Sequence, residues 1–179
     1  MGLFSRKNKG VEVSDVVFIS PEAKLDAMAT LASGKPSFVF IFWFEQSKQD
    51  AELFFNKKEV NPECYMAREI HPHHINNKNV VFGEHFPLRS KEQTLFEELK
   101  LSKVVVYSSL TDPLLKLFGG EKIIELMKTL GLAENEAMEH KMISKSIANA
   151  QEKLEKKVLM EQGAVSAEDW FKKNTVTGH

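Results

Sequence analysis

The chain has 179 residues, of which 42% are hydrophobic and 27% charged, enough to bury one sizeable core in a single domain. Its 24 basic and 25 acidic side chains leave a formal net charge of −1, so no global field favours nucleic acid or an anionic membrane. The longest apolar run, residues 38–44, is too short to span a bilayer, and the basic N-terminus lacks a signal-peptide core. Cys64 is the single cysteine, which excludes an internal disulfide. We expect a cytoplasmic protein with no integral membrane segment and no nucleic-acid partner.

The first two thirds of the chain alternate between short apolar runs and amphipathic runs, the pattern of an α/β layer fold. Strands are predicted at residues 15–20, 37–44, 63–70, 79–85 and 103–110, and helices at 21–33, 45–58 and 87–101. The strand at 37–44 is apolar on both faces, as expected in a mainly parallel sheet that is flanked by helices. Ser20 and Pro21 supply an N-cap and an N1 proline to the first helix.

After Asp112 the strand pattern disappears and helical periodicity continues to about residue 160. Gly119 and Gly120 interrupt the first helical stretch. A long helix is predicted to begin near residue 138. Its apolar stripe consists of Ile143, Ile147, Ala150, Leu154 and Val158.

The tail contains a capping-box pattern, Ser166 with Asp169, directly before Trp170 and Phe171, which predicts a short final helix that docks two aromatic side chains on the body or on a partner. The predicted organisation is a flexible N-terminus at 1–12, an α/β domain at 13–111, a helical extension at 112–160 and a tail at 161–179.

Residues 134–157 have the sequence ENEAMEHKMISKSIANAQEKLEKK. This segment resembles the part of the SecA preprotein-translocase ATPases that leaves their second nucleotide-binding domain and enters their long scaffold helix. Upstream, Tyr107, Ser109, Leu110, Asp112 and Leu114 are in step with the strand and helix before it in that family. The resemblance is specific over residues 104–157. It implies that residues 13–111 form a RecA-like sheet of the P-loop-NTPase type and that the helical extension corresponds to the scaffold entry.

The motifs that a motor needs for ATP chemistry are missing from the sequence. No glycine-rich phosphate loop of the form G-x-x-x-x-G-K-[S/T] occurs in the chain. Where the resembled domain carries arginine-rich motifs, residues 69–78 and 93–103 read EIHPHHINNK and QTLFEELKLSK. Arg89 alone is a poor substitute for an arginine finger and is expected to form a surface ion pair. We therefore expect a degenerate ATPase that is not an enzyme and holds no cofactor.

A histidine-rich region offers a different chemistry. Nitrogen and sulfur ligands for zinc could come from the histidines together with Cys64 and Glu69, but their spacing matches no standard zinc framework. Pro72 also prevents a regular helix that would align them. The candidate metal ligands are His71, His73, His74 and His85.

Three functions follow from these patterns. The first is a non-catalytic SecA-like interaction module that binds a protein partner or a second copy of itself, with a link to protein export implied by the resemblance. The second is a nucleotide-binding protein without hydrolysis, or one that completes a site in trans. The third is a metal-binding protein that uses the histidine region. For the first function, the long helix could instead pack along its own α/β body; the candidate partner-binding residues are Lys145, Asn149, Gln151, Trp170 and Phe171.

Overall fold

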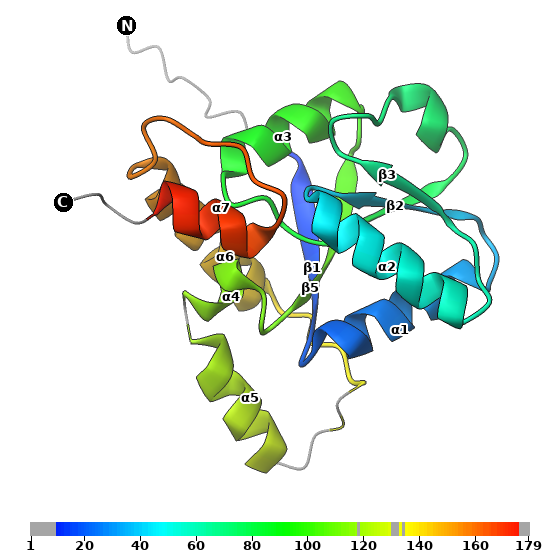
Figure 1. The fold of residues 1–179 in the computed structure, drawn as a ribbon, viewed down its shortest axis with the longest axis horizontal. Helices are drawn as coiled ribbons and strands as arrows, with labels where there is room; N and C mark the ends of the chain where they lie inside the picture. Colours follow the sequence, from blue (N-terminus) through cyan, green and yellow to red (C-terminus); the bar gives the residue numbers. More distant parts are fainter. Residues whose placement is uncertain (1–9, 118, 130–132, 134, 176–179) are drawn as a thin grey trace, which may run out of the picture.

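The computed structural model describes residues 10–117, 119–129, 133 and 135–175. Within these residues, five parallel strands form one sheet in the order β1-β5-β4-β2-β3 (Figure 1). The strands are β1 (Glu12–Phe18), β2 (Phe38–Phe42), β3 (Glu63–Met66), β4 (Asn79–Phe82) and β5 (Lys103–Ser109). The predicted α/β fold with a parallel sheet, as in RecA-like domains, is confirmed.

Helices cover both faces of this sheet. On one face, α1 (Pro21–Ala32) and α2 (Glu45–Lys57) pack on a core that includes Met28, Phe40 and Phe55. On the other face, α3 (Arg89–Glu98) packs through Phe96, and α6 (Lys141–Glu155) lies beside α3 and β1. Successive side chains of a strand point to opposite faces, which explains why apolar runs such as β2 serve both cores.

A third core cluster lies beyond the carboxyl end of the sheet, where α4 (Pro113–Lys116), α6 and α7 (Ala167–Asn174) meet. The predicted break at the two glycines separates α4 from α5 (Gly120–Thr129). Gly119 adopts a φ of 91°, which favours glycine, and a Cβ on Gly120 would lie 2.3 Å from the Leu110 carbonyl oxygen. The chain can therefore turn sharply only with small residues at this point.

The long C-terminal helix begins later than predicted, at Lys141 instead of near residue 138. Met138 is held in an extended bridge to Val17, with backbone hydrogen bonds of 3.0 and 2.8 Å, and so covers the open edge of β1. His140 then caps the helix, because its Nδ1 accepts a hydrogen bond from the Met142 backbone N–H. The helix also ends at Glu155, before the predicted limit at residue 160.

The other boundaries differ by a few residues. The third predicted strand, 63–70, ends at Met66, and a turn and the 3₁₀ helix η1 (Pro72–Ile75) follow. Of the predicted flexible N-terminus 1–12, residues 1–9 lie outside the described residues, and residue 12 already belongs to β1. Among the helices that the structure describes, none is both long and apolar enough to cross a membrane.

Candidate functional site

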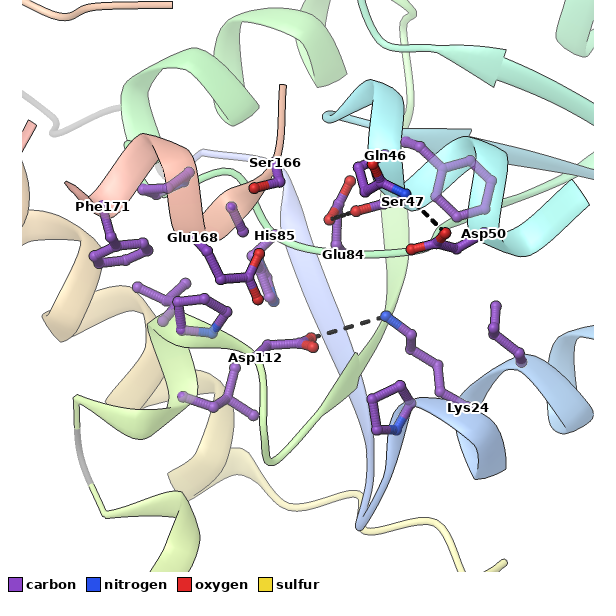
Figure 2. A pocket seen from close by; sticks show the side chains of 18 residues that line it. Lys24, Gln46, Ser47, Asp50, Glu84, His85, Asp112, Ser166, Glu168 and Phe171 are labelled. Carbon is purple, nitrogen blue, oxygen red and sulfur yellow. Dashed lines mark hydrogen bonds and ion pairs between the residues drawn. The ribbon is translucent and has the colours of Figure 1, made fainter. Parts of the chain in front are cut away.

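The strand order of the parallel sheet reverses between β2 and β4. From β2 the chain continues through α2 to β3 on one side, and from β4 it continues through α3 to β5 on the other. In open α/β sheets, ligands bind beyond the carboxyl ends of the strands at such a switch point. Here a cavity of about 190 Å³ lies at this place (Figure 2). We call it the strand-end cavity.

Glu84, two residues after β4, is the buried acid of the strand-end cavity and is only 6% exposed. Its carboxylate accepts hydrogen bonds from the backbone N–H groups of Trp43 and Phe44, each at 3.0 Å, and from Ser47 Oγ at 2.6 Å. Burial raises the pKa of Glu84 to about 7, although nearby Lys24 and the hydrogen bonds favour the charged form. The carboxylate therefore fastens the end of β4 to the start of α2.

Lys24 reaches the strand-end cavity from α1 and is 8% exposed (Figure 2). Its Nζ donates a hydrogen bond of 2.9 Å to the Gly83 carbonyl and lies 3.9 Å from Asp112 Oδ2. Asp112 also accepts a hydrogen bond from the Ser109 backbone N–H at 2.9 Å. Lys24 therefore links α1 to the segment after β4 and to the start of α4.

The charges around the strand-end cavity do not suit a phosphate chain. Lys24 is the only lysine or arginine among the described lining residues, and His85 in the wall is held by carboxylates on both ring nitrogens. Catalysis of phosphoryl transfer requires several positive groups around the phosphates. The lining carboxylates outnumber the lysine: Asp50, Glu84, Asp112 and Glu168.

His85 points to the opposite side of the sheet from Glu84 and is the centre of a buried charged network. Its Nε2 lies 2.5 Å from Asp15 Oδ1, and its Nδ1 lies 2.9 Å from Glu92 Oε1. Burial opposes the charged imidazolium, but the carboxylates of Glu92 and Asp15 outweigh it and raise the pKa of His85 to about 10. The same imidazolium keeps the pKa of Asp15 below its ordinary value despite the burial of that carboxyl. With both ring nitrogens occupied, His85 cannot serve as a general base.

Gln151 of α6 closes this network. Its Nε2 donates to the Phe86 carbonyl at 2.7 Å and to Glu92 Oε2 at 2.8 Å, while Glu92 Oε1 accepts from the Phe86 backbone N–H at 2.7 Å. The SecA-like helix is thereby fixed to the body of its own chain. Gln151, a candidate for partner binding, instead follows the alternative in which the long helix packs along its own body, because the side chain is buried and its amide donors are used internally.

The tail helix was predicted to dock two aromatic side chains on the body or on a partner. Trp170 is 1% exposed, its ring lies edge-on to Phe86 at 6.0 Å, and its Nε1 donates to Glu161 Oε1 at 2.8 Å. Trp170 therefore docks on the body of the chain and is not available as a partner contact. Phe171 next to it is only partly buried, and Lys145 and Asn149 are exposed on α6. These three candidates remain at the surface.

A groove of about 410 Å³ runs between α6 and α7. We call it the α6–α7 groove. Leu117, at the end of α4, forms part of its wall and is 55% exposed. The described lining residues include two lysines and no carboxylate. They are Leu117, Ser146, Asn149, Ala150, Lys153, Leu154, Lys157, Phe171 and Thr175.

The four histidines do not form one site. His71, His73 and His74 gather at the 3₁₀ helix η1, with the rings of His73 and His74 3.9 Å apart, whereas His85 is buried in the network with Asp15 and Glu92. In the part of the chain that the structure describes, no group of three or more His, Cys, Asp or Glu side chains is arranged to hold a metal ion. Burial raises the pKa of Cys64 to about 12, so its thiol stays protonated at neutral pH.

The sequence analysis did not identify the buried charged residues, although the positions of two of them in the sequence indicate burial. Asp15 starts an otherwise apolar strand segment, and Glu92 occupies a position in the buried stripe of α3 with Leu88, Leu95 and Leu99. A carboxylate at a core-facing position implies a buried partner. That partner, His85, is 70 residues from Asp15 in the chain, and the sequence alone did not connect them.

The chain is similar to known proteins over one segment. No protein-family model matches the chain. A stretch of 49 residues is 51% identical to the protein translocase subunit SecA of Acinetobacter baumannii (strain AYE), and the same holds for SecA of Acinetobacter baylyi and of Psychrobacter arcticus. Over this stretch, the chain is a relative of SecA. The match covers 27% of this chain and 5% of each SecA protein, so it concerns one segment and not the whole translocase subunit.

Proposed function

We propose that this chain is a non-catalytic, SecA-like protein-binding module that acts in protein translocation. The link to translocation rests on the relatives, which are named protein translocase subunits. The fold alone would not support it, because α/β sheets of this kind host many functions. The protein-binding role rests on two observations. The charges around the strand-end cavity do not suit a nucleotide, and candidate partner-binding residues of α6 and α7 remain at the surface.

The charge around the strand-end cavity is the observation that carries the non-catalytic part of the proposal. Lys24, the lysine that could meet a phosphate, is already hydrogen-bonded to Gly83 and faces Asp112. Asp50, Asp112 and Glu168 in the lining would repel the phosphates of ATP. In place of a flexible phosphate loop, Glu84 and its three donors hold the ends of β2 and β4 together.

Nucleotide binding gives the direct test of the non-catalytic role. Purified protein is heated with and without Mg²⁺-ATP and with Mg²⁺-ADP, and the unfolding temperature is followed. A nucleotide at one hundred times its dissociation constant would stabilise the folded state by about 2.7 kcal/mol, so even weak binding would be visible. We expect no shift and no ATP turnover. A shift that disappears in Lys24→Met would establish a nucleotide site and contradict the proposal.

The translocation part needs a test in the cell. A strain that lacks this protein is compared with the parent strain while a secreted reporter is pulse-labelled, and the unprocessed precursor is quantified. We expect precursor to accumulate in the deletion strain and to fall again when the Lys24→Met variant is supplied, because the proposal gives Lys24 a structural role and no role in nucleotide binding. Circular dichroism of the variant verifies that it folds without the contacts of Lys24 to Gly83 and Asp112. Unchanged precursor processing in the deletion strain would contradict a role in translocation.

A further inference from the structure

One continuous face of α6 borders the α6–α7 groove. The residues of this face are spaced by 3, 1, 3, 1 and 3 positions, the spacing of a single helical stripe, and Lys157 lies just past the end of the helix. The stripe spans three turns, or about 16 Å. Its members are Ser146, Asn149, Ala150, Lys153, Leu154 and Lys157. A wall of this length, opposite Phe171 of α7 and Thr175 just after it, matches a short helix or peptide and is too long for a single small ion.

The groove combines an apolar floor with a positive rim. Ala150 and Leu154 are buried at its base, and Leu117 and Phe171 add apolar surface from α4 and α7. Lys153 and Lys157 are exposed, and neither forms an ion pair with another described residue, although the surface elsewhere contains several such pairs. An unpaired positive rim around apolar surface favours a ligand that brings both apolar side chains and carboxylates.

We propose that the α6–α7 groove binds an acidic amphipathic segment of a partner protein. Apolar side chains of that segment, one helical turn apart, lie on Leu154 between Leu117 and Phe171, while its carboxylates pair with Lys153 and Lys157. This inference rests on the proposed function as a protein-binding module, and it adds the surface and the chemical class of the partner.

The orientation of the SecA-like helix supports this surface. Gln151 and Ile147 point into the body of the chain, where the buried network and the apolar core hold them. Ser146 and Asn149 point away from that core, while Ala150 and Leu154 pack in it and form the base of the groove, so internal packing leaves the rim of the groove open. The rigid attachment of α6 keeps the groove in one shape before a ligand arrives, which lowers the entropic cost of binding.

The test measures peptide binding to the purified chain by fluorescence anisotropy. The probe is a labelled synthetic helix of roughly four turns with leucines at i, i+3, i+4 and i+7 and glutamates between them. One control peptide replaces the glutamates by lysines, and a second keeps the composition but scrambles the leucine spacing. We expect the acidic amphipathic peptide to bind, with an affinity that falls as salt rises, and both control peptides to bind at least about tenfold more weakly.

Variants of the groove test the position of the peptide. Leu117→Ala should weaken binding about tenfold, and Lys153→Gln and Lys157→Gln about two- to fivefold each, because exposed charge pairs contribute less than buried apolar contacts. The matched controls are Leu53→Ala and Lys57→Gln on α2, an exposed leucine and an exposed lysine outside the groove. Both controls should bind the peptide like the unchanged protein. Circular dichroism of each variant verifies that it is folded.

Three results would overturn the inference. The first is equal binding of acidic and basic peptides, and the second is unchanged binding in Leu117→Ala and both lysine variants. The third is a concentration-dependent dimer in sedimentation that Leu117→Asp abolishes, because the occupant would then be a second copy of this chain. The inference and the proposed function fail separately. Precursor accumulation in the deletion strain that Leu117→Ala still rescues, without peptide binding, removes only the groove, whereas peptide binding without any export defect removes only the translocation role.

Discussion

The two faces of α6 differ sharply in what they contact. The inner face is buried: Gln151 is hydrogen-bonded to Phe86 and Glu92, and Ile147 packs in the core. The face on the α6–α7 groove presents Asn149 and lysines that form no ion pair with a described residue, above the buried Ala150 and Leu154. The inner face uses a glutamine and an isoleucine of the SecA-like motif. Similarity to SecA in this segment is therefore explained first by the packing of the helix, and partner binding has to be sought on the other face.

The largest expected difference between inner and outer positions is at two adjacent residues of α7. Trp170→Ala should lower the free energy of unfolding by about 3–5 kcal/mol, because it empties a fully buried aromatic site. Phe171→Ala should cost about 1–2 kcal/mol, since that ring is only partly buried. Urea denaturation followed by circular dichroism measures both. Equal costs would mean that the groove wall belongs to the core and that the comparison of the two faces is wrong.

A similar loss is expected when the buried network is broken at Glu92. Glu92→Ala leaves the charged His85 ring, the Phe86 N–H and the Gln151 amide without their acceptor. Removing one member of a buried ion pair costs about 3–5 kcal/mol. Glu98→Ala on the exposed side of the same helix should change stability by less than about 0.5 kcal/mol. If the two variants unfold at the same urea concentration, His85 is not held as a buried charge.

The SecA-like motif itself allows a smaller, matched comparison. Gln151→Ala should destabilise the fold by about 1–3 kcal/mol, because the Phe86 carbonyl and Glu92 lose a buried donor. Asn149→Ala, two positions earlier but exposed, should cost less than about 0.5 kcal/mol. The measurement is again the urea midpoint at constant slope. A larger loss at Asn149 than at Gln151 would reverse the assignment of inner and outer faces.

A pH dependence that comes from Glu84 gives the last comparison. Its pKa rises from 4.5 to about 7 on folding. Between these values the folded state binds more protons than the unfolded state, so stability must fall as pH increases from 4.5 to 7. Glu84→Gln removes this titration while an amide oxygen can still accept from Trp43 and Phe44. The difference between the two proteins should change by about 2–3 kcal/mol over that range, and a constant difference would place the Glu84 pKa at its ordinary value.

Much of the fold was predictable because periodicity reports burial directly. The five strands, the N-cap at Ser20 and the short last helix after Ser166 follow from local patterns and were found. The start of α6 was misplaced by about three residues because Met138 pairs with Val17, a contact across more than a hundred residues. Sequence propensities of neighbouring residues contain no information about such a long-range contact.

The site was less predictable than the fold. Glu84 and His85 are adjacent in sequence, yet Glu84 enters the strand-end cavity and His85 enters the network with Asp15. The histidine count suggested metal ligands, whereas the pairing of His85 with two carboxylates depends on β1, α3 and the end of β4 being brought together. No spacing along the chain encodes that pairing.

The sequence by itself determined the alternation of strands and helices, the lack of a phosphate loop and the similarity of one stretch to SecA, since each depends on residues close together in the chain. Only the tertiary structure decided which face of α6 is buried, which charges are buried and which surfaces of the described residues stay open. The reason is that burial and charge pairing arise between segments that lie far apart in the chain, here β1, α3, α6 and α7.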